Sequence, residues 1–162
     1  MFKRKLFAIA LILVLVASMA VWVGTSKATP ASGLTIEPIA SGSLSDPVEA
    51  KFKPQSGVVH TDVTKITMNK QTLAPGGTTG WHQHGGPIWV VVASGTLTLY
   101  DGDNPSCTGV VYPAGSAFMD PGDHTHLARN EGSENVVVYV TFMLPEGGAT
   151  RIDVPAPGNC PF

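Results

Sequence analysis

Short apolar runs alternate with turn signals along most of the chain beyond residue 33. The runs are rich in Val, Ile, Thr and aromatic residues, which favour strands, and they read LTIEPIA, VVHTDVTKITM, PIWVVVA, GTLTLY, GVVY, SAFM, HTHLARN and NVVVYVTFML. Gly- and Pro-rich segments such as APGGTTG and DPGD separate them. No part of this region repeats apolar residues with helical spacing over three turns. The pattern predicts an all-β fold, either a sandwich or a barrel.

The N-terminal 28 residues have a different pattern. The segment MFKRK places three cations before an uncharged and almost continuously apolar stretch, residues 6–26. Ser26 and Ala28 supply the small residues of a cleavage site after Ala28, so residues 1–28 are interpreted as a signal peptide. The apolar stretch is also long enough to be an uncleaved membrane anchor. Both alternatives make the rest of the chain secreted or extracytoplasmic, because the positive end stays in the cytoplasm.

The exported part is one acidic domain. Residues 29–33 are small and polar and are expected to form a tether, which leaves residues 34–162 as a single domain of ordinary size. The whole chain has ten Lys and Arg against twelve Asp and Glu. The leader holds four of those cations and none of the acids, so six cations face twelve acids in the remainder. A nucleic-acid partner is excluded because no excess of positive charge is available to neutralise phosphates.

Both cysteines, Cys107 and Cys160, fall in the exported part. An even number of cysteines in an oxidising compartment indicates one disulfide. A metal site that uses both is the alternative, but their wide spacing and the lack of a second Cys pair disfavour it. By the loop-entropy model such a bridge contributes roughly 4 kcal/mol to stability.

Four of the five histidines occur as two His-x-His pairs, each beside a Gly/Pro turn. The pairs are His82 with His84 and His124 with His126. Residues i and i+2 of a strand point to the same face, so each pair offers two imidazoles to one side. A single His-x-His pair is more often a polar feature of the surface than a metal site. Two facing pairs, however, form a nitrogen-rich pocket suited to a transition metal.

These segments resemble the two sequence motifs of the cupin superfamily. The first motif, G-x5-H-x-H-x3,4-E-x6-G, is matched in GGTTGWHQHGGPIWVVVASG by Gly76, His82, His84 and Gly95. The second, G-x5-P-x-G-x2-H-x3-N, is matched in GSAFMDPGDHTHLARN by Gly115, Pro121, His126 and Asn130. The resemblance implies a single-domain antiparallel cupin-type β-barrel, similar to a jelly roll. It also implies one divalent transition metal held by three ligands: His82, His84 and His126.

Two positions depart from the motifs. Ile88 stands where the family has its Glu ligand, and by strand parity it points the same way as the two histidines before it. Asp123 replaces the glycine of the second motif. His124 shares the parity of His126, so it is either a fourth ligand or a supporting residue behind the ligands. His60 matches no motif and is expected at the surface.

The resemblance implies a small-molecule ligand but not its identity. Three imidazoles accept Fe, Mn, Co, Ni, Cu or Zn, and the affinity order favours Cu or Zn. The expected function is to bind or act on a small anionic or chelating organic molecule, with dioxygenase- or isomerase-like chemistry. The alternatives are a non-catalytic metal- or metabolite-binding module and a structural protein. Only His124, Tyr112 and Asp120 are candidate acids or bases, so no catalytic residue is assigned.

Partners and packing follow from the same interpretation. Cupins often pair, which allows a homodimer, and the membrane is a partner only if the leader stays uncleaved.

Five aromatic residues either line a ligand pocket or fill the core, and the core is the favoured interpretation in an antiparallel barrel. They are Trp81, Trp89, Phe118, Tyr139 and Phe142.

Overall fold

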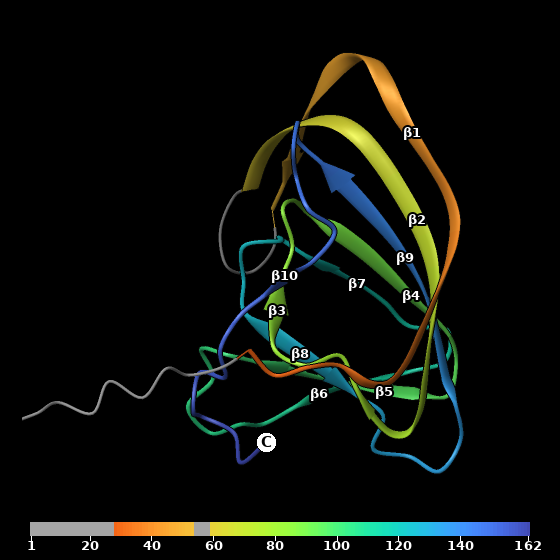
Figure 1. The fold of residues 1–162 in the computed structure, drawn as a ribbon, viewed down its shortest axis with the longest axis vertical. Helices are drawn as coiled ribbons and strands as arrows, with labels where there is room; N and C mark the ends of the chain where they lie inside the picture. The colour runs from red at the N-terminus through yellow and green to blue at the C-terminus, as the bar shows by residue number, and fades with distance from the viewer. Residues whose placement is uncertain (1–27, 54–58) are drawn as a thin grey trace, which may run out of the picture.

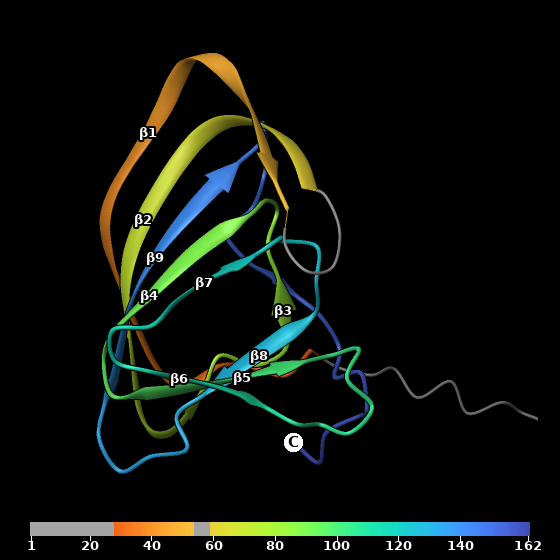
Figure 2. The ribbon, with the colours of Figure 1, turned by 180° about the vertical axis from the view of Figure 1, so that it is seen from behind.

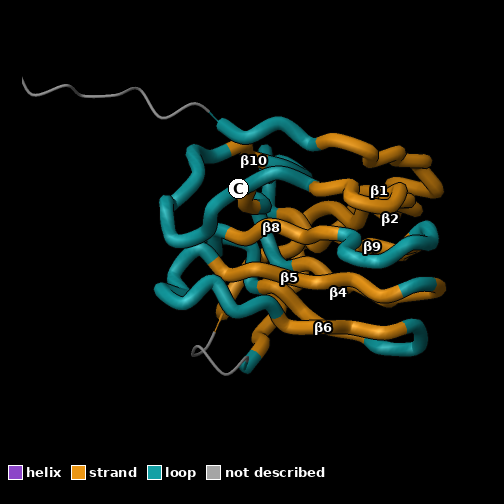
Figure 3. The backbone as a smooth tube through the Cα atoms, turned by 90° about the horizontal axis from the view of Figure 1, so that it is seen from below, coloured by secondary structure: helices purple, strands orange, loops and turns teal. Residues whose placement is uncertain are grey.

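The computed structural model describes residues 28–53 and 59–162, and over these residues it contains strands and loops but no helix (Figures 1 and 3). Six of the predicted runs coincide with β4 to β9, whereas β1 and β2 extend well beyond the two earlier runs. The pattern does not predict β3 and β10, because two residues are too few to show alternation. The strands are β1 (Ser32–Phe52), β2 (Val59–Thr78), β3 (His82–Gln83), β4 (Ile88–Ser94), β5 (Thr96–Asp101), β6 (Val110–Pro113), β7 (Ala117–Asp120), β8 (His126–Arg129), β9 (Val136–Leu144) and β10 (Ile152–Asp153).

The strands pair antiparallel throughout and curl into a nearly closed barrel. Their order is β10-β3-β8-β2-β9-β4-β7, with β1 added beside β2, and with β5 joined to both β8 and β6. In Figures 1 and 2, β1, β2, β9, β4 and β7 form one wall, and β8, β5 and β6 lie across from it. The predicted all-β antiparallel barrel is therefore confirmed.

The core lies between the two walls and follows the two-residue period of the strands. Alternate residues of β4 and β9 are buried, as Val90 and Val140 show at 4% exposure each. Leu97 of β5 and Leu127 of β8 are buried at 2%. Because the side chains of a strand alternate between its faces, the inward-facing residues form both the core and the lining of an interior cavity.

The aromatic residues divide between the two faces of the wall. Trp81 and Phe142 are buried at 2% exposure or less, and Phe118 packs against the core cluster. Trp89 and Tyr139 are instead 41% and 43% exposed. The expectation that the aromatic residues are core is wrong for these two, because strand parity places them on the outer face, opposite in direction to their buried neighbours.

The N-terminal end of the described chain contacts the domain. Ala28 forms an isolated β-bridge with Pro155, and Thr29 Oγ1 accepts a hydrogen bond of 2.7 Å from the backbone N–H of Trp81. The predicted leader, residues 1–28, lies outside the described residues except for Ala28. Over residues 28–53 and 59–162, no helix has the length and apolar character needed to cross a membrane.

The loop that follows β5 and the C-terminal segment lie side by side. Cys107 and Cys160 are at disulfide-bonding distance, with their Cα atoms 5.2 Å apart. Asn159 Nδ2 donates hydrogen bonds to the carbonyls of Asp101 at 2.9 Å and Asn104 at 2.7 Å. This arrangement permits the predicted bridge.

Candidate metal centre

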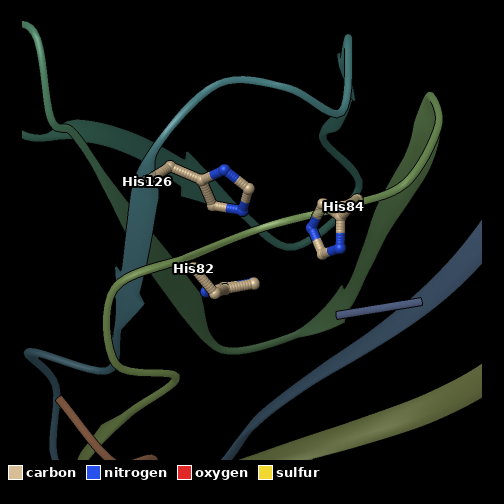
Figure 4. A group of neighbouring side chains, drawn as sticks. All are labelled: His82, His84 and His126. Atoms are coloured by element: carbon tan, nitrogen blue, oxygen red, sulfur yellow. The ribbon is translucent and has the colours of Figure 1, made fainter. Parts of the chain in front are cut away.

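Two short elements bring three histidines together inside the barrel. His82 begins β3, His84 follows two residues later, and His126 begins β8, where the register pairs it with His82. All three are buried, at 5–6% exposure. Their ring centroids lie 4.4 to 5.0 Å apart, and Figure 4 shows the rings facing one another. The structure thus brings together the three residues that the two motifs single out.

The Nδ1 atom of each of these imidazoles lies within hydrogen-bond distance of a backbone carbonyl. His82 Nδ1 lies 2.8 Å from the Gly80 carbonyl, and His84 Nδ1 lies 2.6 Å from the Thr150 carbonyl. His126 Nδ1 lies 3.0 Å from the His124 carbonyl. A carbonyl oxygen only accepts hydrogen bonds, so Nδ1 carries the proton in all three rings. The lone pair of each neutral ring is therefore on Nε2, as metal coordination requires.

Gly80 is required for this support. It has a φ of +68°, a conformation that side chains disfavour. A Cβ atom at this position would also collide with the backbone carbonyl of Thr29. Glycine therefore lets the chain turn tightly under His82 and present the carbonyl that fixes its ring.

The electrostatic environment keeps the rings of His82 and His84 neutral. Burial, together with the neighbouring His126 and His84, lowers the pKa of His82 to about 2. Burial and His126 lower the pKa of His84 to about 4. Both rings thus keep their lone pairs at physiological pH, and neutral imidazole is the form that binds metal.

The residues present fit a metal ion. His84 Nε2 is buried and has no hydrogen-bond partner among the described residues. One ring nitrogen of each histidine lies within 4.8 Å of those of the other two. A buried acceptor without a partner costs about 1–3 kcal/mol, and coordination to a cation removes that cost. Three convergent imidazoles are also a common donor set for first-row transition metals.

A buried carboxylate supports His126. Asp120 ends β7 and is 5% exposed. Its Oδ2 lies 3.2 Å from His126 Nδ1, and its Oδ1 accepts a 2.7 Å hydrogen bond from the Gly122 N–H. Burial raises the pKa of Asp120, but these interactions with His126 and Gly122 outweigh it and hold that pKa below 3.8. Asp120 is therefore ionised. It orients the His126 ring and makes the lone pair of Nε2 more basic, which strengthens its binding to a metal ion.

The three histidines line an apolar cavity within the barrel. Its space is about 420 Å³, counting the part open to solvent. Gln71 and Thr79 are the other polar residues in its lining, and the rest is apolar. Ile88 lies in this lining, as its strand parity predicts, where the motif has a carboxylate. The cavity therefore offers an apolar surface beside the three imidazoles that could hold a metal ion.

The imidazole of His124 lies outside the three-histidine group. Its Nε2 is 3.2 Å from Asp103 Oδ2 and 3.5 Å from Asp101 Oδ1, and both carboxylates are largely exposed. Only the backbone carbonyl of His124 contacts the buried group, through His126. The structure thus places the His124 backbone, and not its side chain, behind the ligands.

Two further positions from the sequence analysis lie at the surface. His60 is exposed, with its Nδ1 3.4 Å from the carboxylate of Glu49. Asp123 is exposed as well, and the left-handed residue of its turn is Gly122, with a φ of +108°. The turn before His126 therefore needs no glycine at position 123.

Comparison with known proteins supports the fold and the motifs. The Cupin_2 family model, described as a cupin domain, matches residues 69–142. A cupin-2 domain protein of Rhodospirillum rubrum, Rru_A2000, is 14% identical with a TM-score of 0.51, over 78% of this chain and 66% of that one. A cupin_2 domain of an XRE family transcriptional regulator from Enterobacter cloacae is 18% identical with a TM-score of 0.48, over 70% and 99%.

A third solved structure covers a smaller share of this chain. Recombinant oxalate oxidase in complex with glycolate is 26% identical, with a TM-score of 0.44, over 49% of this chain and 42% of that one. This chain thus matches less than half the length of that enzyme. No curated protein matches the chain.

Proposed function

The chain belongs to the cupin superfamily, and on that premise we propose that it binds one divalent transition-metal ion through Nε2 of His82, His84 and His126. The ion and the apolar cavity beside it then hold a small anionic or chelating organic molecule. The observation that carries the proposal is the buried Nε2 of His84, which has no hydrogen-bond partner among the described residues while its Nδ1 is fixed by a carbonyl.

The charge of this site supports an anionic ligand. Three neutral imidazoles leave a divalent ion its full charge, whereas a carboxylate ligand would cancel one unit of it. Ile88 supplies no such carboxylate and lowers the local dielectric, so an anion in the cavity feels the ion strongly. A chelating anion such as a hydroxy-acid or an enolate matches this site best.

Turnover and simple binding are both compatible with such a site. A bound ion would supply Lewis-acid polarisation of a chelated oxygen, which suits isomerase-like chemistry. A redox-active ion such as Fe would also supply the electron transfer that dioxygenase-like chemistry requires. The second candidate is a non-catalytic metal- or metabolite-binding module. It is favoured by the cavity lining, which contains no carboxylate, and by Asp120, which is engaged with His126 and Gly122. Among the described residues that line the cavity, the histidines are then the only groups for proton transfer.

The proposal includes export and a bridged domain. The leader sends residues 29–162 out of the cytoplasm, where Cys107 and Cys160 form a disulfide. Copper and zinc are the favoured ions there by affinity order, with Fe, Mn, Co and Ni as alternatives. The domain is monomeric or a homodimer, and the membrane is a partner only through an uncleaved leader.

Metal analysis of the exported protein tests the proposal. We expect about one ion per chain, and a Co²⁺ titration of the stripped protein to give visible absorption bands of nitrogen ligation. A protein that binds no metal in either experiment would overturn the proposal. Oxygen uptake with a panel of enols, thiols and catechols then tests for dioxygenase-like turnover, because neither an isomerase nor a non-catalytic module consumes oxygen.

A further inference from the structure

A second space adjoins the barrel cavity at the histidines. It measures about 320 Å³, counting its solvent-open part. Its wall contains the charged Arg151 and the buried amide of Asn69, neither of which lines the first cavity. A ligand on the metal therefore has an apolar space on one side and, on the other, a space of mixed lining that contains an arginine and two amides. The residues shared by both spaces are Gln71, Thr79, His82 and His84.

Arg151 is brought to the histidines by strand pairing. β10 pairs antiparallel with β3 and sets Asp153 opposite His82. The same register, continued by two residues, sets Arg151 opposite His84, and directly opposed residues of antiparallel strands share a face. The 2.6 Å contact between the Thr150 carbonyl and His84 Nδ1 fixes this approach. Arg151 therefore lies on the same face as His82 and His84.

The guanidinium of Arg151 has capacity for a second anion. Its side chain is 27% exposed, and its Nε donates to Asp153 Oδ1 at 2.6 Å. Among the described residues, Asp153 is its one acidic ion-pair partner. A guanidinium carries five N–H donors, more than one carboxylate accepts. Donors thus remain for a ligand that enters the second space.

Two amides complete the polar wall. Asn69 and Gln71 lie two residues apart on β2 and so share a face. Gln71 Nε2 donates to Asn69 Oδ1 at 3.2 Å. Their other amide groups give a ligand carboxylate or hydroxyl additional hydrogen-bond partners. The second space therefore offers an oxygen-rich anionic group several hydrogen-bond partners, beside the apolar side chains of Leu34, Ile36 and Phe142.

We propose that the second space is a distal-carboxylate subsite and that Arg151 sets the ligand class. The ligand is a small dicarboxylate that carries a hydroxyl or keto group beside one carboxylate. This chelating end occupies the metal site, and the other carboxylate binds Arg151. The inference rests on the proposed metal-binding function and specifies its ligand.

Malate and lactate test this assignment, because they share the 2-hydroxy acid and differ by the distal carboxylate. Each is titrated into the Co²⁺-loaded protein and followed by the cobalt absorption bands. We expect the parent protein to bind malate about tenfold or more tighter than lactate, as an Arg–carboxylate pair provides. Arg151→Gln should bind the two equally while its cobalt and lactate affinities stay at the parent values. Lys65→Gln, which removes an exposed cation elsewhere on β2, should keep the preference.

A second variant tests Arg151 without removing it. Asp153→Asn takes away the carboxylate that competes for the guanidinium, so it should tighten malate binding and leave lactate binding unchanged. If the cobalt-loaded parent shows no malate preference, or Arg151→Gln keeps one, the subsite is wrong and the metal-binding function stands. If the parent binds no cobalt, the proposed function and this inference both fail.

Discussion

Two groups of side chains that could hold a metal ion differ in their burial. His82, His84 and His126 are buried. Asp101, Asp103 and His124 lie where β5 ends, and their most exposed member is Asp103, whose side chain is 84% exposed. Both groups bring three ligand atoms within 4.8 Å of one another. Proximity alone therefore does not distinguish them.

The difference lies in what the ligand atoms already bind. In the exposed group, His124 Nε2 lies 3.2 Å from Asp103, and Asp101 Oδ1 accepts a 2.7 Å hydrogen bond from the Asp103 N–H. These atoms satisfy one another and water, so an ion must displace existing partners. In the buried group, every Nδ1 faces a backbone carbonyl, and His84 Nε2 has no hydrogen-bond partner in residues 28–53 and 59–162. Preorganisation favours the buried group as the metal site.

Removing a ligand from the buried group should have the largest effect. Loss of a residue that is hydrogen-bonded to a metal ligand weakens metal binding by roughly 10- to 100-fold. We expect His126→Ala, which removes a ligand itself, to weaken Co²⁺ binding by more than that. His82→Ala and His84→Ala should behave alike, because two imidazoles retain little chelate advantage. The control variants His60→Ala and Asp103→Asn should bind cobalt like the parent. Normal cobalt affinity in His126→Ala would show that the metal lies elsewhere.

The support behind a ligand should rank next. Asp120→Asn keeps the size of the side chain but removes the charge that holds His126 Nδ1–H. We expect metal affinity to fall by about 10- to 100-fold, measured by competition with a chelator. Asp123→Asn, an exposed change in the same turn, is the matched control. Equal losses in both variants would mean that the turn's net charge, and not the contact with His126, sets the affinity.

The ligand histidines could be predicted from the sequence, but their supports could not. His82 and His84 are local in sequence, and strand parity alone places them on one face. Asp120 and Thr150 act on His126 and His84 through the register of β7 and the return of the C-terminal segment. Those placements depend on long-range pairing, which no local pattern encodes. The fold class was predictable because short apolar runs separated by turns are a local pattern. β3 and β10 are too short to show that pattern, and the position of Arg151 beside the histidines depends on the pairing of β10 with β3.

A smaller effect is expected from adding charge to the buried group. Ile88→Glu places a carboxylate in the cavity lining and should weaken azide binding to the cobalt-loaded protein, since it cancels one positive charge. Ile88→Gln, similar in size and uncharged, separates charge from shape and should change azide affinity much less. Equal azide affinities in the parent and the Glu variant would contradict the idea that Ile88 faces an open coordination position.

Breaking the disulfide should affect the exposed group more than the buried one. Cys107 lies in the loop that follows Asp101 and Asp103, so the bridge holds that loop against the C-terminal segment. Mass spectrometry without reductant should show a cross-linked peptide, and Cys107→Ser should lower stability by roughly 4 kcal/mol. Cobalt affinity should change little. Full alkylation of both thiols without reductant would refute the bridge.

The smallest effect is expected from His124→Ala. This change removes the imidazole that joins the exposed group, but it keeps the backbone carbonyl that accepts the hydrogen bond from His126 Nδ1. Asp120 also remains as the second acceptor of that Nδ1 proton. Co²⁺ affinity and the cobalt absorption spectrum should therefore match those of the parent, with Thr125→Ala as a neighbouring control. A shifted spectrum together with lost affinity would mean that the His124 ring moves inward to coordinate the ion, and the two groups would then act as one site.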